Sequence, residues 1–235
     1  MRGKLKAVKA GSLRSNVVES IRDAIFSGRL RPGDALRELQ LAKELQVSQA
    51  TVREALLELQ HSGLVVRIDN KGTMVTKLSG EEVGERLAIR VPLETIAAIE
   101  AARHMTERDF NELDRRLDLI AKALDTNSCV KTDQADLAFH RYIWDMSGNR
   151  TLYKILDQLT VPLFAFVSIV RSRRLEDLKV VTRSHEPIAS AIKSGQPEAI
   201  EKAIRAHMET SYNRFTSLSV TEFDTLVHQN QAVNS

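Results

Sequence analysis

The chain has 235 residues, 43% of them hydrophobic, which is enough for two domains with packed cores. No apolar run reaches the roughly 18 residues that cross a membrane, and the basic N-terminus lacks the apolar segment of a secretory signal. The single cysteine, Cys129, cannot form an intrachain disulfide, so we expect a cytoplasmic protein.

Positive charge is concentrated in the first third of the chain. Residues 1–77 contain 14 Lys/Arg and 8 Asp/Glu, which gives a net charge of +6. Residues 78–235 contain 20 Lys/Arg and 23 Asp/Glu, which gives a net charge of −3. Because phosphate groups attract clustered cations, the first part is expected to bind nucleic acid and the second to bind something else. The Lys-rich residues 1–11 are predicted to be a flexible arm, although a disordered terminus without a role explains them equally simply.

Residues 12–77 show the order of elements of a winged helix-turn-helix. A helix is predicted over 12–27, a second one ends near residue 46, and Ser48 can cap a third. Gly63 ends that helix, and two β-branched runs over 64–68 and 73–77 follow. The segment Asp69-Asn70-Lys71-Gly72 between them has the residue types of a tight hairpin.

The start of the third helix is short, polar and cationic, which is what the first turn of a DNA recognition helix requires. A solvated helix start would look the same in isolation, but here the preceding helix and the wing lie at the right distances. We expect DNA contacts from the first turn, from the residue before the second helix and from the wing, namely Arg37, Ser48, Gln49, Ala50, Thr51, Arg53, Asn70, Lys71 and Gly72.

This region resembles the N-terminal domain of the GntR family of bacterial transcription regulators. The resemblance covers about residues 12–77 and rests on the runs 27–36, Leu41-Ala42, Val47-Ser48 and 51–56. Most relatives carry Arg where this chain has Gln49, a position that often touches DNA in the family. Gln can also read adenine, so the operator is expected to differ from the family's usual one.

Residues 78–218 show only helical periodicity, which predicts an all-helical domain of about six helices and a mainly α fold for the chain. The tail over 219–235 is polar and expected to be flexible. Pro92 and Pro162 fall inside predicted helices, and Pro92 should kink or interrupt the first of them. The helices are predicted over about 79–104, 106–125, 132–146, 151–173, up to 194, and 197–218.

Four polar residues of this domain are expected to meet. Asp136 and His140 are four residues apart and so share a helix face. His185 and His207 flank the turn near residue 195 at similar distances, so they stand at one level of a helical hairpin. One carboxylate and three imidazoles suit a divalent transition metal such as Zn, Ni or Mn. Buried histidines without a metal, or an exposed Asp136–His140 pair, are the simpler alternatives.

The second domain resembles the FCD ligand-binding domain of the FadR-like branch of that family, over about residues 80–216. The resemblance implies that Asp136, His140, His185 and His207 bind metal, that a small organic acid is the effector, and that Arg90 faces the effector pocket. Arg90 is flanked by apolar residues, so it is either buried with an anion or extends outward. Asn149 also fits a family motif, although a helix-ending turn explains it too.

The favoured function is a ligand-responsive regulator, usually a repressor in this family, that binds a near-palindromic operator as a homodimer. A metalloenzyme fused to a DNA-binding module is an alternative, because a metal with an open position could activate water. The sequence shows no further general base, nucleophile motif or phosphate loop, so we do not expect an enzyme. A constitutive DNA binder whose helical domain only dimerises is the third reading.

Overall fold

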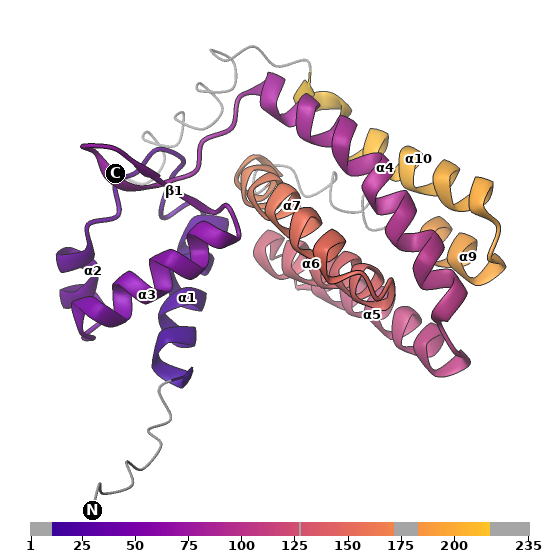
Figure 1. Cartoon of the computed structure of the whole chain (residues 1–235), viewed down its shortest axis with the longest axis horizontal. Coiled ribbons are helices and arrows are strands. Elements are labelled where there is room, and N and C mark those ends of the chain that lie inside the picture. Colours follow the sequence, from indigo (N-terminus) through magenta and orange to yellow (C-terminus); the bar gives the residue numbers. More distant parts are fainter. Residues whose placement is uncertain (1–10, 127, 172–182, 217–235) are drawn as a thin grey trace, which may run out of the picture.

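A computed structural model describes residues 11–126, 128–171 and 183–216 (Figure 1). Apart from Gly11, the predicted arm over 1–11 lies outside these residues, as does the predicted tail over 219–235. Within the described residues, no helix is long and apolar enough to cross a membrane. The elements are α1 (Gly11–Phe26), α2 (Glu38–Glu44), α3 (Gln49–His61), β1 (Val65–Ile68), β2 (Gly72–Val75), α4 (Gly80–His104), α5 (Glu107–Asp125), α6 (Cys129–Met146), α7 (Arg150–Arg171), α9 (Glu186–Ser194) and α10 (Pro197–Thr216).

Helices α2 and α3 form the predicted helix-turn-helix. The turn between them depends on Gln46, whose φ of 55° lies in the left-handed region. The Ser48 side chain then caps α3 by accepting a 3.1 Å hydrogen bond from the backbone N–H of Thr51. The buried face of α3 consists of Val52, Ala55, Leu56 and Leu59. Because that face packs on the domain core, the first turn of the helix stays accessible.

The wing is a two-stranded antiparallel hairpin. Val65 lies opposite Val75, and Ile68 lies opposite Gly72. The turn between the strands requires left-handed backbone at Asn70, with φ of 62°, and at Gly72, with φ of 84°. Asn and Gly tolerate this conformation better than other residues, so the turn sequence fixes the register of the strands.

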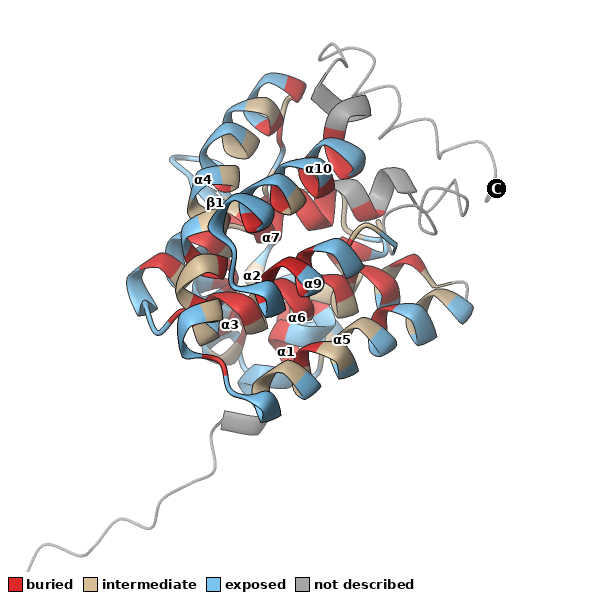
Figure 2. Cartoon of the chain, turned by 90° about the vertical axis from the view of Figure 1, so that its right-hand side faces the viewer, coloured by how far each residue is buried: buried red, intermediate tan, exposed pale blue. Residues whose placement is uncertain are grey.

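The second domain is built from six described helices, α4 to α7, α9 and α10, as the sequence predicted. Helix α4 contacts α6, α7, α9 and α10, and α10 lies along it (Figure 1). Each helix turns its buried residues toward the others and its exposed residues outward (Figure 2). The interior of this bundle therefore receives side chains from several elements that are distant in sequence.

Three features of the helices differ from the predictions. Pro92 does not interrupt α4, which continues from Gly80 to His104 and is started by a capping box at Ser79. Helix α6 begins at Cys129 rather than near residue 132, because Ser128 caps it. Helix α9 begins only at Glu186, so His185 stands just ahead of the helix and not within it.

The two domains share one apolar core. A single cluster joins the winged domain to buried residues of α6 and α7, among them Trp144, Leu156 and Phe164. Two hydrogen bonds reinforce this contact. The Ser168 hydroxyl of α7 donates to the Phe26 carbonyl of α1 at 3.0 Å, and the Gln134 amide donates to Asp23 at 2.8 Å. The winged domain is therefore packed on α7 and is not attached by a linker alone.

Pro162 is the contact point of α7 with the winged domain. Because Pro has no N–H, the Gln158 carbonyl one turn earlier loses its helical donor. Arg86 of α4 replaces that donor, with Nη1 3.3 Å from the Gln158 carbonyl oxygen. Gly63, at the entry to the wing, packs directly on the Pro162 ring. One proline thus links α4, α7 and the wing.

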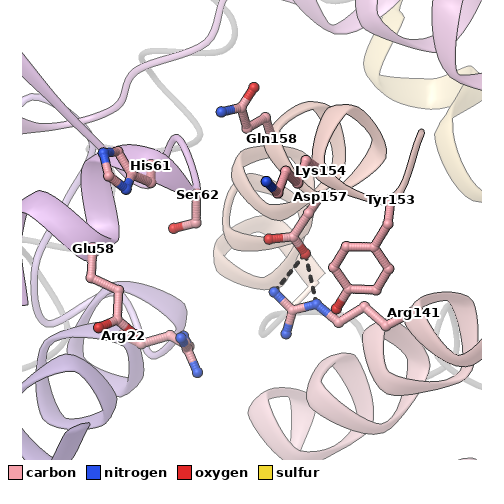
Figure 3. A pocket seen from close by; sticks show the side chains of 9 residues that line it. All are labelled: Arg22, Glu58, His61, Ser62, Arg141, Tyr153, Lys154, Asp157 and Gln158. Carbon is pink, nitrogen blue, oxygen red and sulfur yellow. Dashed lines mark hydrogen bonds and ion pairs between the residues drawn. The ribbon is translucent and has the colours of Figure 1, made fainter. Parts of the chain in front are cut away.

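A cavity of about 460 Å³ separates the domains beside this contact (Figure 3). Glu58 and His61 of α3 face Lys154 and Gln158 of α7 across it. Arg141 and Asp157 form an ion pair on the α7 side, with Nε and Oδ1 2.7 Å apart. The lining of this cavity therefore carries both acidic and basic groups.

Substituting Gly63 tests the contact between the domains. A Cβ atom at Gly63 would lie 3.0 Å from Pro162 Cγ, whereas one at Gly33 would meet nothing within 4 Å. Both glycines have positive φ, of 75° and 88° respectively. We expect Gly33→Ala to lower the free energy of unfolding by about 1–2 kcal/mol through backbone strain. Gly63→Ala should lower the free energy of unfolding by about 1–3 kcal/mol more than Gly33→Ala, because the added methyl group overpacks the contact with Pro162. Urea denaturation measures both free energies. Equal losses in the two variants would contradict a tight contact at Pro162.

Candidate DNA-binding surface and candidate metal centre

The predicted DNA contacts of the winged domain are accessible to solvent. All nine are exposed except Thr51, which is half-buried because it pairs with Ser48. The wing residues Asn70, Lys71 and Gly72 form the exposed tip of the hairpin. The first turn of α3 therefore has the accessibility that a helix entering the major groove requires.

Glu38, the first residue of α2, holds two of these side chains. Its carboxylate accepts a 2.9 Å hydrogen bond from Gln49 Nε2 and a 2.8 Å hydrogen bond from Arg53 Nη2. Arg53 Nε also donates to it, at 3.1 Å. These hydrogen bonds from Arg53 and Gln49 lower the pKa of Glu38, so it carries a full negative charge near neutral pH. The sequence did not point to Glu38, because its partners are 11 and 15 residues away.

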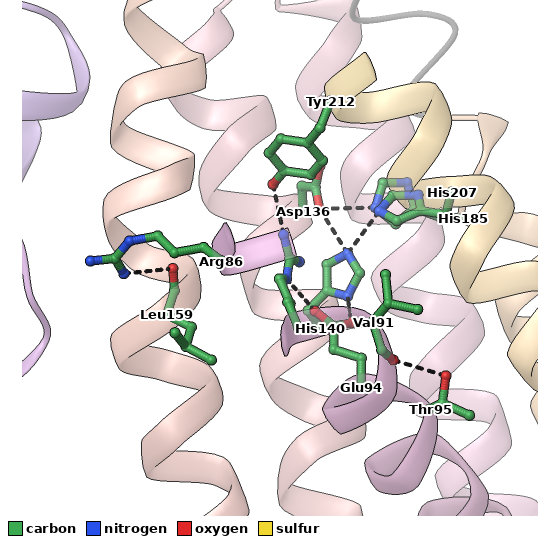
Figure 4. A network of polar contacts seen from close by, with 11 residues as sticks. Arg86, Val91, Glu94, Thr95, Asp136, His140, Leu159, His185, His207 and Tyr212 are labelled. Carbon is green, nitrogen blue, oxygen red and sulfur yellow. Dashed lines mark hydrogen bonds and ion pairs between the residues drawn. The ribbon is translucent and has the colours of Figure 1, made fainter. Parts of the chain in front are cut away.

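The four predicted metal ligands meet inside the helical domain (Figure 4). Asp136 and His140 come from α6, His185 precedes α9, and His207 comes from α10. All four are almost fully buried, with exposed fractions of 0–3%. The three histidines offer nitrogen atoms that lie within 4.8 Å of one another. The predicted convergence of these side chains is therefore present.

The distances in this cluster fit ligands around a single ion. His140 Nε2 lies 3.2 Å from His207 Nε2, and Asp136 Oδ1 lies 2.9 Å from His185 Nε2. Asp136 Oδ1 is also 3.4 Å from His140 Nε2. Two ligands bonded to one ion at about 2.0–2.1 Å stand roughly 2.9–3.4 Å apart in octahedral or tetrahedral geometry. The residues present can thus hold a divalent metal ion with little rearrangement.

Further side chains orient two of the imidazoles. His140 Nδ1 lies 2.9 Å from Glu94 Oε2, and His207 Nδ1 lies 2.8 Å from the Ser184 hydroxyl. When Nδ1 donates to an oxygen, the lone pair is left on Nε2, the atom that faces the cluster. Such support is typical of histidines that bind metal. Glu94 and Ser184 were missed in the sequence, although Glu94 lies one helical turn from Arg90.

Arg90 is buried next to this cluster and does not extend outward. Its Nε donates to Glu94 Oε1 at 2.5 Å, and its Nη1 donates to the Tyr212 hydroxyl at 2.7 Å. Its guanidinium carbon also lies 5.5 Å from the centre of the Phe164 ring. The remaining nitrogen, Nη2, is buried and has no hydrogen-bond partner among the described residues. Burying an unpaired donor is costly, so this atom is suited to an added acceptor.

The protonation of the cluster follows from its charges. Burial would raise the pKa of Glu94, but Arg90 and His140 outweigh it and lower that pKa to about 2. Burial would likewise lower the pKa of His140, yet Glu94 and Asp136 raise it to about 9. Burial and the neighbouring histidines keep the pKa of His207 well below its usual range. The site therefore combines ionised carboxylates with at least one neutral imidazole, and His140 must lose its proton before its Nε2 can bind a metal ion.

Asn149 lies elsewhere. It is exposed, and its side-chain oxygen accepts a 3.0 Å hydrogen bond from the backbone N–H of Leu152, which caps the start of α7. It lines a separate cavity of about 480 Å³ together with Trp144 and Lys154. The structure thus supports the helix-end explanation of Asn149 and does not bring it into contact with the buried cluster.

Comparison with known proteins matches both domains. Residues 13–75 match the family described as "Bacterial regulatory proteins, gntR family", and residues 85–210 match the "FCD domain" family. The chain is 30% identical to the "Uncharacterized HTH-type transcriptional regulator YdhC" of Bacillus subtilis, over 80% of this chain and 84% of the relative. It is 29% identical to the "Probable D-xylose utilization operon transcriptional repressor" of Paenarthrobacter nicotinovorans, over 83% of this chain and 87% of the relative.

A solved structure shows the same fold. "E. coli McbR/YncC" superposes with a TM-score of 0.75 at 22% sequence identity, covering 87% of this chain and 97% of that one. The two family matches and the curated relatives, rather than this structure, indicate a DNA-binding regulator and not an enzyme. This chain belongs to the GntR family of bacterial transcription regulators, and its helical domain is an FCD domain.

Proposed function

We propose that this regulator is a repressor whose helical domain binds a divalent metal ion and a small organic acid, and whose affinity for its operator depends on that acid. The observation that carries the proposal is Arg90, a fully buried cation with one unpaired nitrogen beside three convergent histidines. A buried cation with a free donor is suited to a carboxylate.

The metal would be held by Asp136, His140, His185 and His207. Three nitrogens and one oxygen suit Zn, Ni or Mn, and such an ion would supply the positive charge that protonated His140 otherwise provides. Four protein ligands leave one or two positions on a five- or six-coordinate ion. A carboxylate oxygen of the effector could occupy such a position while Arg90 Nη2 binds the same molecule.

Helix α7 is the best candidate for coupling this site to DNA binding. Its Phe164 lies beside Arg90 and has its ring centre 6.2 Å from that of His140. One half-turn away, Pro162 packs on Gly63 of the winged domain. An effector that binds more tightly to one position of α7 would shift the winged domain toward the matching position. The ratio of the effector's affinities for the two positions of α7 would limit the change in operator affinity.

We further propose that two copies bind a near-palindromic operator, because a homodimer with two-fold symmetry presents its recognition helices to two half-sites about one turn of DNA apart. Repression is the proposed sign of regulation. It is supported by the Paenarthrobacter nicotinovorans relative, whose name describes a probable transcriptional repressor.

Removing two ligands tests the metal site. We expect about one metal ion per chain in protein purified without chelator, and none in the double variant His140→Ala/His207→Ala. The matched control is His61→Ala/His104→Ala, which removes two exposed histidines outside the cluster and should keep the metal. Elemental analysis gives the content, and circular dichroism checks folding. A wild-type protein without metal would refute this part of the proposal and leave Arg90 Nη2 as the proposed contact of the organic acid.

Removing a supporting hydroxyl tests how the site is organised. Ser184→Ala deletes the oxygen next to His207 Nδ1 but no metal ligand. We expect about a tenfold loss in metal affinity, since support of this kind is typically worth 10–100-fold. Competition with a chromogenic chelator measures it, and Ser190→Ala on the exposed side of α9 is the control. Unchanged affinity would mean that Ser184 does not orient the imidazole.

The effector response can be measured before the effector is known. A DNA sequence selected by the protein from a random library is titrated in the presence of small mono-, di- and tricarboxylic acids. At least one acid should change DNA affinity by about fivefold or more, in the usual range of allosteric coupling. Arg90→Lys should weaken that response, whereas Arg205→Lys, which changes an exposed residue, should not. Equal affinity with every acid would favour a constitutive DNA binder.

A further inference from the structure

We propose that Glu38 is a positioning residue that sets which bases Gln49 and Arg53 read. The inference deepens the proposed operator binding and rests on it. Glu38 does not need to touch DNA for this role, because it acts through the two side chains that it holds. Both of these lie on the exposed first turns of the recognition helix α3.

The position of Glu38 is fixed by the helix-turn-helix. It is the first residue of α2, and its side chain reaches α3, where it accepts hydrogen bonds from Gln49 and Arg53. Gln49 and Arg53 are four residues apart, so they are neighbours on one helix face. The side chain of Glu38 is 26% exposed and that of Arg53 is 57% exposed. An ion pair this exposed adds little stability, so its main effect is on side-chain orientation.

The carboxylate determines how the Gln49 amide is oriented. An ionised carboxylate can only accept hydrogen bonds, so the amide nitrogen must face Glu38, as it does at 2.9 Å. The amide oxygen and the second N–H of the nitrogen then remain available to a base. In the major groove, adenine presents the N6 donor beside the N7 acceptor, whereas guanine presents two acceptors, O6 and N7. Gln49 held by Glu38 should therefore prefer adenine.

A Gln side chain that is free to rotate behaves differently. It can turn either its oxygen or its amide nitrogen toward a base, so it can also donate to guanine O6 or thymine O4. Loss of Glu38 should therefore broaden the base preference at this position. A purely structural role for Glu38 would weaken binding to all sequences alike and would leave the base preference unchanged.

Arg53 is constrained in a complementary way. Its Nε and Nη2 atoms face Glu38, at 3.1 Å and 2.8 Å. The opposite edge of the guanidinium, Nη1 with the second N–H of Nη2, remains free for two parallel hydrogen bonds. Guanine O6 and N7 are the acceptors that match such an edge. Each half-site should thus contain a guanine next to the position read by Gln49.

The experiment is selection of bound sequences from a random double-stranded DNA library, with the full-length wild type, Glu38→Ala and Glu44→Ala. Glu44 is exposed on the same helix and pairs with Gln40, so its loss removes the same charge without touching α3. Wild type and Glu44→Ala should select a guanine beside a position where adenine exceeds each other base by about tenfold. In Glu38→Ala, the adenine preference should fall to about twofold, and the guanine preference should fall as well.

Three outcomes would overturn the inference. The same base frequencies in wild type and Glu38→Ala would show that Glu38 does not position the reading side chains. No adenine preference beside the guanine in the wild type would show that Glu38 does not hold Gln49 in the DNA complex. No enriched sequence with the wild type would refute sequence-specific operator binding itself, and the inference with it. Thermal melting by circular dichroism confirms that each variant is folded.

Discussion

The interior of the helical domain depends on the pairing of buried charges by Glu94. Its two oxygens bind Arg90 and His140 at once, so one carboxylate compensates a guanidinium and an imidazole. Leaving either partner buried and unpaired would cost several kcal/mol, about as much as the net stability of many domains. The positions of α4 and α6 are therefore set by this pairing as well as by apolar packing.

The same chain of contacts explains how a buried site can influence a distant surface. Arg90 reaches α10 through Tyr212 and α7 through the ring of Phe164. Helix α7 also carries the residues that hold the winged domain, Pro162 and Ser168. Because close-packed side chains move as units rather than deform gradually, these contacts are the route by which the proposed effector would shift the winged domain.

The sequence was sufficient for features that depend on local pattern. Apolar spacing located α3, turn residues located the wing, and Asp136 with His140 could be placed on one face because they share a helix. The spacing of His185 and His207 around the turn near residue 195 placed them at one level, and the family resemblance grouped them with Asp136 and His140. Sequence pattern was insufficient where a contact joins distant segments. Glu94, Ser184 and Glu38 act on residues far along the chain, and no periodicity relates them.

The proline in α7 has a consequence for how the family can vary. Pro162 deprives the Gln158 carbonyl of its donor, Arg86 replaces that donor, and Gly63 leaves room for the ring. A residue other than proline at this position would restore the helical hydrogen bond and compete with Arg86. A larger residue at position 63 would require a smaller one at 162. Among regulators with this domain arrangement, positions 63, 86 and 162 should therefore change together during evolution rather than one at a time.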